Sequence, residues 1–141
     1  MSASIEVDAV LLARHIARLD EMCEHWSQVL IEAEPVAIRS LNKASVSEEA
    51  GVYIFHHDGQ VKYIGKSKNL RKRICTQHLG SNKRQSTLRR KVSRHLGTDD
   101  EAFISKWLET TTVAWLPLGS HRLTLAVEDY AVEKFKPPLN G

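Results

Sequence analysis

Apolar side chains recur along the first quarter of the chain at alternating spacings of four and three residues. This spacing predicts one long amphipathic helix over residues 6–33. Two arrangements would bury its apolar seam: packing against the rest of the chain, which we expect, or pairing with a second copy as a homodimer. The seam consists of six residues: Leu12, Ile16, Leu19, Cys23, Trp26 and Leu30.

The segment at 34–50 is polar and contains Pro35, so we expect it to be a linker. The expected organisation is therefore an N-terminal helix and linker at 1–47, followed by a folded domain at 48–141. No internal repeat is visible.

A different pattern begins at Gly51, where two short apolar runs flank a polar turn. The runs are Gly51–Phe55 and Val61–Gly65, and the turn contains Asp58-Gly59, so this stretch predicts a β-hairpin. A third run at Thr111–Leu118 is β-branched and apolar, which is typical of another strand.

Helical patterns occupy the segments between and after these strands. They predict four helices: 69–79, 86–97 with Ser86 as the N-cap, one opening at the capping-box residues 98–101, and one from Ser120 to Phe135. The order helix–ββααα–β–α predicts an α/β sandwich. Its sheet is small, three-stranded and mostly antiparallel, with helices around it and a long helix before it.

The composition is that of a globular chain of 141 residues, 42% hydrophobic and 26% charged. No apolar run approaches the ~20 residues that span a bilayer, and residues 1–10 lack the pattern of a secretory signal. Cys23 and Cys75 lack metal-ligand spacing and suit a reducing compartment. We therefore expect a cytoplasmic protein with no membrane partner and no zinc site.

Charge is strongly segregated along the chain. Residues 59–98 hold 12 of the 20 Lys and Arg residues and no Asp or Glu, which leaves 8 basic against 17 acidic residues elsewhere. Such segregation is typical of a surface that faces a polyanion. Nucleic acid is the expected partner, with a solvated basic face as the alternative.

Several motifs occur together in the second part of the chain. Gly51-Val52-Tyr53 is followed by Tyr63-Ile64-Gly65 and then by the basic segment KSKNLRKR, which ends in Arg73. Glu128, Pro137 and Asn140 come later. With these motifs, residues 48–141 resemble the GIY-YIG nuclease superfamily, as a stand-alone minimal domain. The resemblance implies a metal-dependent endonuclease that hydrolyses phosphodiester bonds, most naturally in DNA.

The resemblance also implies a catalytic set, which comprises Tyr53, Tyr63, Arg73 and Glu128. Tyr53 would position or deprotonate the nucleophile, and Tyr63 would support it with a hydrogen bond. A tyrosine with an ordinary pKa near ~10 helps only if cations lower that value, and we expect the basic segment to supply them. Arg73 would stabilise the transition state, because its planar fork can hold two phosphate oxygens.

Glu128 is unusual for its place on the last predicted helix. On a helical wheel it falls between Val132 and Phe135, whereas Asp129 and Glu133 share a polar face. A carboxylate on an apolar stripe needs a partner, and the resemblance makes Glu128 a metal ligand. With one such carboxylate, a single Mg²⁺ or Mn²⁺ ion is expected, its shell completed by water and substrate phosphate.

Supporting residues are expected around this set. Gly51 and Gly65 would serve close backbone packing, and Asn140 would order the edge of the site. Many family members place a His or Tyr four residues after the helix arginine, where this chain has Gln77. His78 follows, but in a regular α-helix it would lie ~140° from Arg73. We expect Tyr53 to act without this helper; the alternative is a locally rewound helix that brings His78 in.

Ten basic residues are candidates for nucleic-acid binding: Lys66, Lys68, Arg71, Lys72, Lys83, Arg84, Arg89, Arg90, Lys91 and Arg94. A metal-dependent endonuclease is the leading hypothesis. A catalytically inactive nucleic-acid-binding protein of the same fold is the second, since position 77 lacks a proton acceptor. A protein-interaction module that uses the N-terminal seam is the third.

Overall fold

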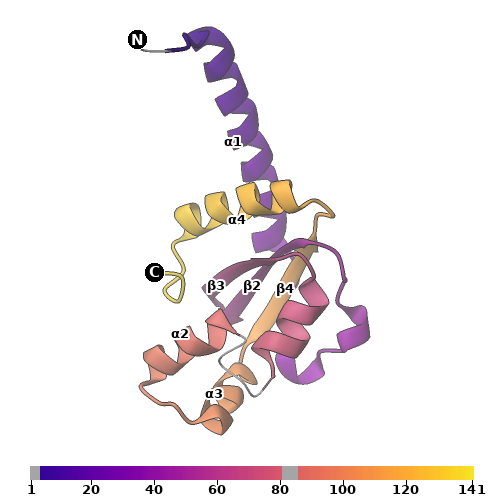
Figure 1. Cartoon of the computed structure of the whole chain (residues 1–141). Coiled ribbons are helices and arrows are strands. Elements are labelled where there is room, and N and C mark those ends of the chain that lie inside the picture. Colours follow the sequence, from indigo (N-terminus) through magenta and orange to yellow (C-terminus); the bar gives the residue numbers. More distant parts are fainter. Residues whose placement is uncertain (1–3, 81–85) are drawn as a thin grey trace.

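The computed structural model describes residues 4–80 and 86–141. Its centre is a four-stranded, fully antiparallel sheet in the order β1-β4-β2-β3 (Figure 1). The strands are β1 (Val36–Ala37), β2 (Gly51–His57), β3 (Gln60–Ser67) and β4 (Thr112–Pro117). The hairpin and the third predicted strand are thus present, and the α/β architecture is as expected.

The expectation of three strands was wrong, because the segment predicted as a linker contributes a fourth. Val36 and Ala37 pair with Val113 and Thr112 at the edge of β4. A two-residue strand is too short to produce an alternating pattern, so nothing in the sequence marks it. Two short 3₁₀ turns, Ile38–Ser40 and Lys43–Ser45, then lead the chain to β2.

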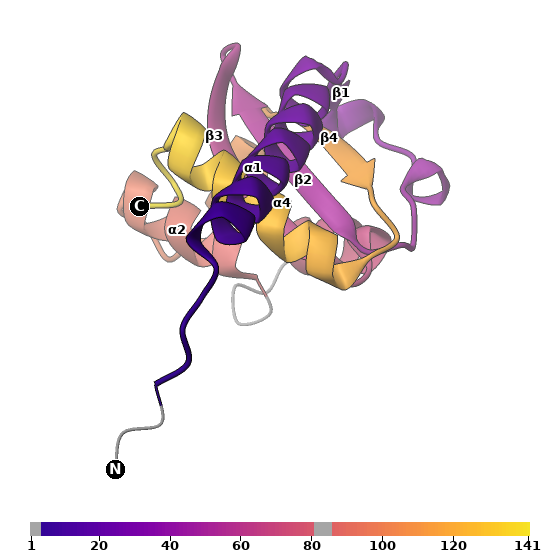
Figure 2. The same ribbon diagram turned by 90° about the horizontal axis from the view of Figure 1, so that it is seen from above.

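Helices cover both faces of the sheet, and the central strand β2 is buried on both. Two helices, α1 (Ala9–Glu32) and α4 (His121–Phe135), lie on one face, where Val52, Ile54, Ile64 and Val127 form the core (Figures 1 and 2). The opposite core contains Tyr53 and Phe55 with residues from η3 (Lys72–His78), α2 (Thr87–Leu96) and α3 (Glu101–Leu108). Double burial explains why residues 51–55 are continuously apolar rather than alternating.

The helix starts follow the predicted capping chemistry, with one adjustment. Ser86 and Ser120 cap α2 and α4 through their hydroxyl oxygens, and Gly97 ends α2 in the left-handed conformation. At α3 the N-cap is Asp100 rather than Thr98, since its carboxylate accepts hydrogen bonds from the backbone of Ala102 and Phe103.

The helix predicted at 69–79 is present but wound differently. Residues Lys72–His78 form a π-helix, closed by a bond from the Leu79 N–H to the Ile74 carbonyl five residues earlier. A π-helix places residue i+5, rather than i+4, above residue i. This one change in winding decides which side chain faces Tyr53.

The N-terminal seam divides into two halves. Cys23 and Leu30 are buried against the chain's own α4 and sheet, as expected, and Glu24 accepts hydrogen bonds from Tyr130 and Lys134 of α4. The other half projects beyond the domain (Figures 1 and 2), and its seam residues are 47–50% exposed: Leu12, Ile16 and Leu19. Among the described residues, no helix is long and apolar enough to cross a membrane.

The division predicts opposite outcomes for two leucines of the same helix. Leu30→Ala removes a fully buried side chain and should lower the free energy of unfolding by about 2–5 kcal/mol. Leu19→Ala removes a half-exposed one and should change it by no more than about 0.5 kcal/mol. Urea unfolding of the two variants beside the wild type measures both; equal losses would mean that the exposed half is also covered.

Candidate active site

A pocket of about 210 Å³ opens where the β2–β3 hairpin meets η3, α2 and α4. All four predicted catalytic residues line it, although they come from three separate parts of the chain. They are joined by Gly65 and Asn140 from the predicted supporting set, and by Ile64, Lys66 and Thr87. Gly51, Gln77 and His78 lie outside this lining.

The position of Tyr53 depends on the absence of a side chain at Gly65. The two residues are directly opposite each other on β2 and β3. A Cβ atom at Gly65 would lie 2.3 Å from both the Cζ atom and the hydroxyl oxygen of Tyr53, so any side chain there would displace the ring. Gly51 has a structural reason of the same kind, since its Cβ would lie 2.1 Å from the Leu116 carbonyl oxygen.

The π-helix brings His78 against Tyr53, and the expected regular winding was wrong. His78 is fully buried, and its Nε2 atom forms a hydrogen bond with the Tyr53 hydroxyl. Gln77, the residue at the expected position, instead lines a neighbouring groove with Lys66 and Lys72. Because the π-helix has one more residue per turn, His78 faces Tyr53 in place of Gln77 and supplies the proton acceptor that Gln77 lacks.

The surroundings of His78 keep its imidazole neutral. Burial, reinforced by the positive charges of Arg73 and Arg89, lowers the pKa of His78 to about 3. We assign the proton to Nδ1, which lies 2.5 Å from the Ser86 hydroxyl oxygen, because Nε2 then accepts from Tyr53. The same Ser86 oxygen accepts the Arg89 backbone N–H at 3.0 Å, so the cap of α2 also holds the histidine.

Tyr53 does not have the lowered pKa that its cationic neighbourhood was expected to produce. Burial, with a smaller contribution from nearby Tyr63, raises the pKa of Tyr53 well above its ordinary value, and the opposing effect of Arg73 is outweighed. The hydroxyl therefore stays protonated and serves as the hydrogen-bond donor to His78. The Tyr63 ring lies beside it, with 6.2 Å between ring centroids.

Two charged groups of opposite sign face the pocket. The Glu128 side chain on α4 is 15% exposed, and its carboxylate accepts a hydrogen bond from the Lys66 ammonium group at 2.6 Å. Arg73 projects from η3, and within 4–80 and 86–141 its guanidinium makes no hydrogen bond or ion pair. The Arg73 guanidinium is thus available, among the described residues, to bind an anion. The Glu128 carboxylate is already paired with the Lys66 ammonium group.

Asn140 extends the hydrogen bonding of the sheet at the rim of the pocket. Its side-chain amide donates to the Ile64 carbonyl at 2.7 Å and accepts the Ile64 N–H at 2.8 Å, and the Leu139 N–H donates to the Lys62 carbonyl at 3.0 Å. The chain end thereby covers the outer edge of β3, which carries Tyr63 and Gly65.

Two of the ten predicted nucleic-acid-binding residues serve the fold instead. Arg89, expected on the surface, is fully buried and pairs with Glu101 at 2.9 Å while donating to the His78 carbonyl. Arg71 points away from the pocket and donates to Glu48 and to the carbonyls of Val46 and Ala44. Lys83 and Arg84 lie outside the described residues. Five others line the pocket or the grooves beside it, namely Lys66, Lys68, Lys72, Lys91 and Arg94, and Arg90 is exposed on α2.

Sequence reasoning missed three residues of this region. Ser86 was recognised only as a helix cap, and its bond to His78 depends on the π-helix. Thr87 and His121 are the first residues of α2 and α4, and line the pocket and the neighbouring groove respectively. No local pattern marks either one.

The chain is similar to one family of known proteins and to several solved structures. A family model described as the GIY-YIG catalytic domain matches residues 29–141. Two crystal structures of the GIY-YIG N-terminal endonuclease domain of UvrC from Thermotoga maritima are similar to the chain. The magnesium-bound domain is 23% identical, with a TM-score of 0.45 over 70% of this chain and 91% of that one. A point mutant bound to its catalytic divalent cation is also 23% identical, with a TM-score of 0.45 over 70% and 90%. No curated protein sequence matches the chain.

The neutral, buried His78 predicts a specific dependence of stability on pH. Its folded-state pKa of about 3 lies below the value near 6.5 of the unfolded chain. The unfolded state therefore binds the proton first, and the stability contributed by His78 falls as the pH drops from about 6.5 towards 3. The slope from this one group is about 1.4 kcal/mol per pH unit.

Urea unfolding between pH 4 and 7 checks this slope. His78→Gln should remove it, so that the difference in unfolding free energy between wild type and variant shrinks steadily towards acid pH. His15→Gln changes an exposed histidine of α1 and should leave the wild-type slope intact. A constant difference between wild type and His78→Gln would contradict the prediction.

Proposed function

This chain belongs to the GIY-YIG catalytic domain family, and on that premise we propose that it is a divalent-metal-dependent endonuclease that hydrolyses phosphodiester bonds in DNA. One observation carries the proposal. A single pocket joins a tyrosine bonded to a neutral histidine, an arginine whose guanidinium has no partner among the described residues, and a carboxylate that pairs with a lysine ammonium group. Those are the groups that hydrolysis at phosphorus requires.

In the proposed mechanism, Tyr53 works as a proton relay rather than as a tyrosinate. A water molecule beside the Tyr53 hydroxyl gives up a proton to that oxygen as it attacks the phosphorus, and the Tyr53 proton passes to Nε2 of His78. The bond between phosphorus and the leaving sugar oxygen breaks, and that oxygen takes up a proton from solvent. Tyr53 ends the step neutral and His78 ends it as an imidazolium. The raised pKa of Tyr53 is compatible with this route, since no free tyrosinate forms.

Substrate binding would adjust the basicity of His78. Arg73 is one of the two cations that lower the pKa of the histidine. A phosphate held by the Arg73 guanidinium would offset that charge, so that the imidazole becomes a better proton acceptor once the substrate is in place. The same guanidinium would stabilise the charge that develops on the phosphate oxygens.

The pocket fits one hard divalent cation, such as Mg²⁺ or Mn²⁺. The Glu128 carboxylate is largely buried yet accessible from the pocket, and it already accepts a cationic group at 2.6 Å. Across the described ranges no cluster of three or more His, Cys, Asp or Glu side chains exists, so Glu128 would be the only protein carboxylate on the ion. Such an ion, when bound, supplies Lewis-acid stabilisation of a phosphate oxygen.

The inactive nucleic-acid-binding protein is a weaker proposal than it was on sequence alone. Its one support was the lack of a proton acceptor at position 77. The bond between His78 and Tyr53 supplies such an acceptor from the next residue. The exposed half of α1 keeps a contact with a second copy possible, independently of the pocket.

Incubation of labelled single-stranded, duplex and branched DNA with the protein and Mg²⁺ or Mn²⁺ tests the proposed function. We expect internal cleavage by the wild type, abolished by chelation of the metal. Glu128→Gln and Arg73→Lys should each lower the rate at least about 10²-fold, because one removes the ion's ligand and the other the planar fork. Arg18→Gln changes an exposed residue of α1 that lines neither the pocket nor the grooves beside it. It is the control and should cleave DNA at the wild-type rate.

Absence of cleavage of every substrate by the wild type would overturn the proposal. Cleavage by Glu128→Gln at the wild-type rate would instead overturn the role given to that carboxylate.

The ion pair between Lys66 and Glu128 predicts a competition that can be measured without DNA. Because the lysine ammonium occupies the carboxylate, Lys66→Met should lower the dissociation constant for Mn²⁺, by up to about fivefold for a partly exposed pair. Titration followed by electron paramagnetic resonance reports free Mn²⁺ directly.

Lys62→Met changes a lysine on the same strand whose ammonium group donates to Gln60 at 3.5 Å, and the variant should bind Mn²⁺ as the wild type does. In a Glu128→Gln background the Lys66 substitution should have no effect. Equal Mn²⁺ affinities of wild type and Lys66→Met would show that the ion does not use Glu128 or does not displace the lysine.

A further inference from the structure

Two additional grooves adjoin the candidate active site, and both are basic. The first, the β3–η3 groove, has a volume of about 390 Å³ and includes Lys68, Lys72 and His121 in its lining. The second, the α2 groove, has a volume of about 250 Å³ and is lined by Lys91, Arg94 and His95 against the end of the chain. Neither groove has an Asp or Glu side chain in its described lining.

The β3–η3 groove runs directly into the catalytic pocket. Lys66 and Arg73 line both, so the two share a wall. An anion in this groove would therefore sit next to one held by the Arg73 guanidinium. His121, at the start of α4, also lines this groove.

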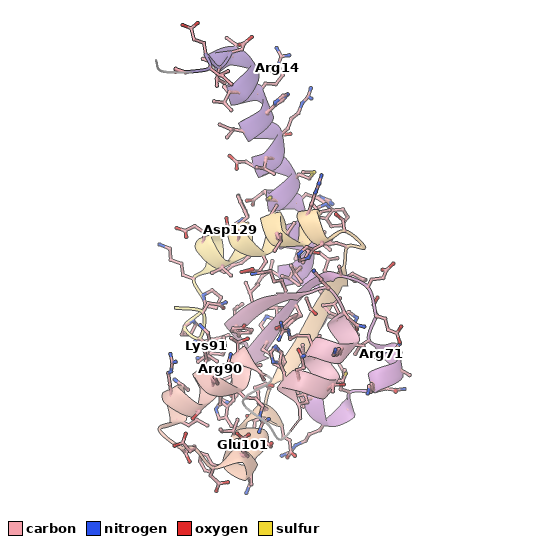
Figure 3. The ribbon with its side chains drawn as sticks, in the orientation of Figure 1. Arg14, Arg71, Arg90, Lys91, Glu101 and Asp129 are labelled. Carbon is pink, nitrogen blue, oxygen red and sulfur yellow. The ribbon has the colours of Figure 1, made fainter. Side chains whose placement is uncertain are left out.

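The α2 groove continues from the pocket on its other side. Thr87 lines the pocket, and Lys91 and Arg94 follow it four and seven residues later, which places all three on one face of α2. The Lys91 ammonium donates to the Asn140 carbonyl at 3.3 Å, and Asn140 is itself part of the pocket. Lys91 accordingly faces the terminal segment in Figure 3.

The two grooves lie at opposite ends of the pocket. In the view of Figure 1, η3 and the start of α4 are at the right of the molecule, whereas α2 and the chain's C-terminal end are at the left. The pocket, which touches η3, α2 and α4, lies between them. Seven residues of α2 extend about 10 Å, which corresponds to about three nucleotides of a B-form strand.

We propose that the two grooves bind the phosphates on either side of the scissile one, so that a DNA strand lies across the pocket from the β3–η3 groove to the α2 groove. This inference rests on the proposed function. It adds that both flanks of the cleaved bond are held, by Lys68 and Lys72 on the β3–η3 side and by Lys91 and Arg94 on the α2 side. The substrate is thereby an internal phosphodiester rather than a strand end.

Binding without cleavage tests the path separately from the chemistry. Anisotropy titrations of a labelled 20-nucleotide DNA with EDTA present give the dependence of affinity on salt, whose logarithmic slope falls by about 0.7–0.9 for each phosphate that the protein no longer neutralises. Lys68→Gln/Lys72→Gln and Lys91→Gln/Arg94→Gln should each lower the slope by roughly 1.4–1.8. Arg18→Gln/Lys106→Gln removes the same charge from exposed sites elsewhere and should leave it unchanged.

Neutral methylphosphonate linkages then assign each groove to a flank of the bond that the wild type cuts in Mg²⁺. In EDTA, a neutral linkage on either flank should weaken wild-type binding. The affinity of each double variant should be unaffected by neutral linkages on one flank of the cut bond. The flank should differ between the two variants. Insensitivity on the same flank, or slopes equal to that of the charge-matched control, would overturn the path.

The two proposals fail in different ways. A protein that binds DNA with the predicted slopes but never cuts it retains the β3–η3 and α2 grooves as phosphate sites and loses the proposed function. A protein that cuts DNA while both double variants bind with the slope of the control keeps the function and loses the path.

Discussion

The buried hydrogen bond between Tyr53 and His78 is the constraint around which the site is built. Burying a hydroxyl and an imidazole in an apolar core costs free energy unless their polar atoms form hydrogen bonds. Here each of these hydrogen bonds depends on a separate feature of the fold. Gly65 leaves room for the Tyr53 ring, and the π-helix turns His78 towards it. The hydroxyl of Ser86 lies against the second imidazole nitrogen, and the Arg89 guanidinium holds the His78 carbonyl. The hairpin, η3 and α2 are therefore tied together through one histidine.

That constraint also shapes the electrostatics on which the proposed chemistry depends. The same burial raises the pKa of Tyr53 and lowers the pKa of His78, so both groups are neutral in the free protein. In the proposed relay the Tyr53 oxygen takes up the water proton as its own proton passes to His78, so no free tyrosinate forms. Arg73 is the element that a bound phosphate would alter, because its positive charge acts on both members of the pair. Substrate binding and proton transfer would then be coupled through one guanidinium.

Sequence patterns predicted the elements whose periodicity extends over several residues. The hairpin, β4, α2 and α4 follow from apolar runs, a polar turn, helical spacing and capping residues, and the family motifs led to a predicted catalytic set whose members meet in one pocket. Two features had no such signal. The two residues of β1 are too few to alternate, and a π-turn differs from an α-turn by a single residue with no composition of its own. The second of these reversed the expectation for Gln77 and His78, since the facing side chain depends on the winding of the helix.

The number of basic residues in a segment does not show how many of them lie on the surface, because some are buried. The segment 59–98 is uniformly basic in sequence, yet Arg71 and Arg89 direct their guanidinium groups to backbone carbonyls and to Glu48 and Glu101 within the fold. A planar fork with five donors suits that structural use, because it can satisfy several buried acceptors at once. Four lysines of the same segment, Lys66, Lys68, Lys72 and Lys91, line the grooves, where a flexible and well-hydrated ammonium group can meet a phosphate at little cost. Arg89 thus fixes His78, and Arg71 fixes the segment that leads to β2. The positive charge available to a nucleic acid is carried largely by lysines, together with Arg73 and Arg94.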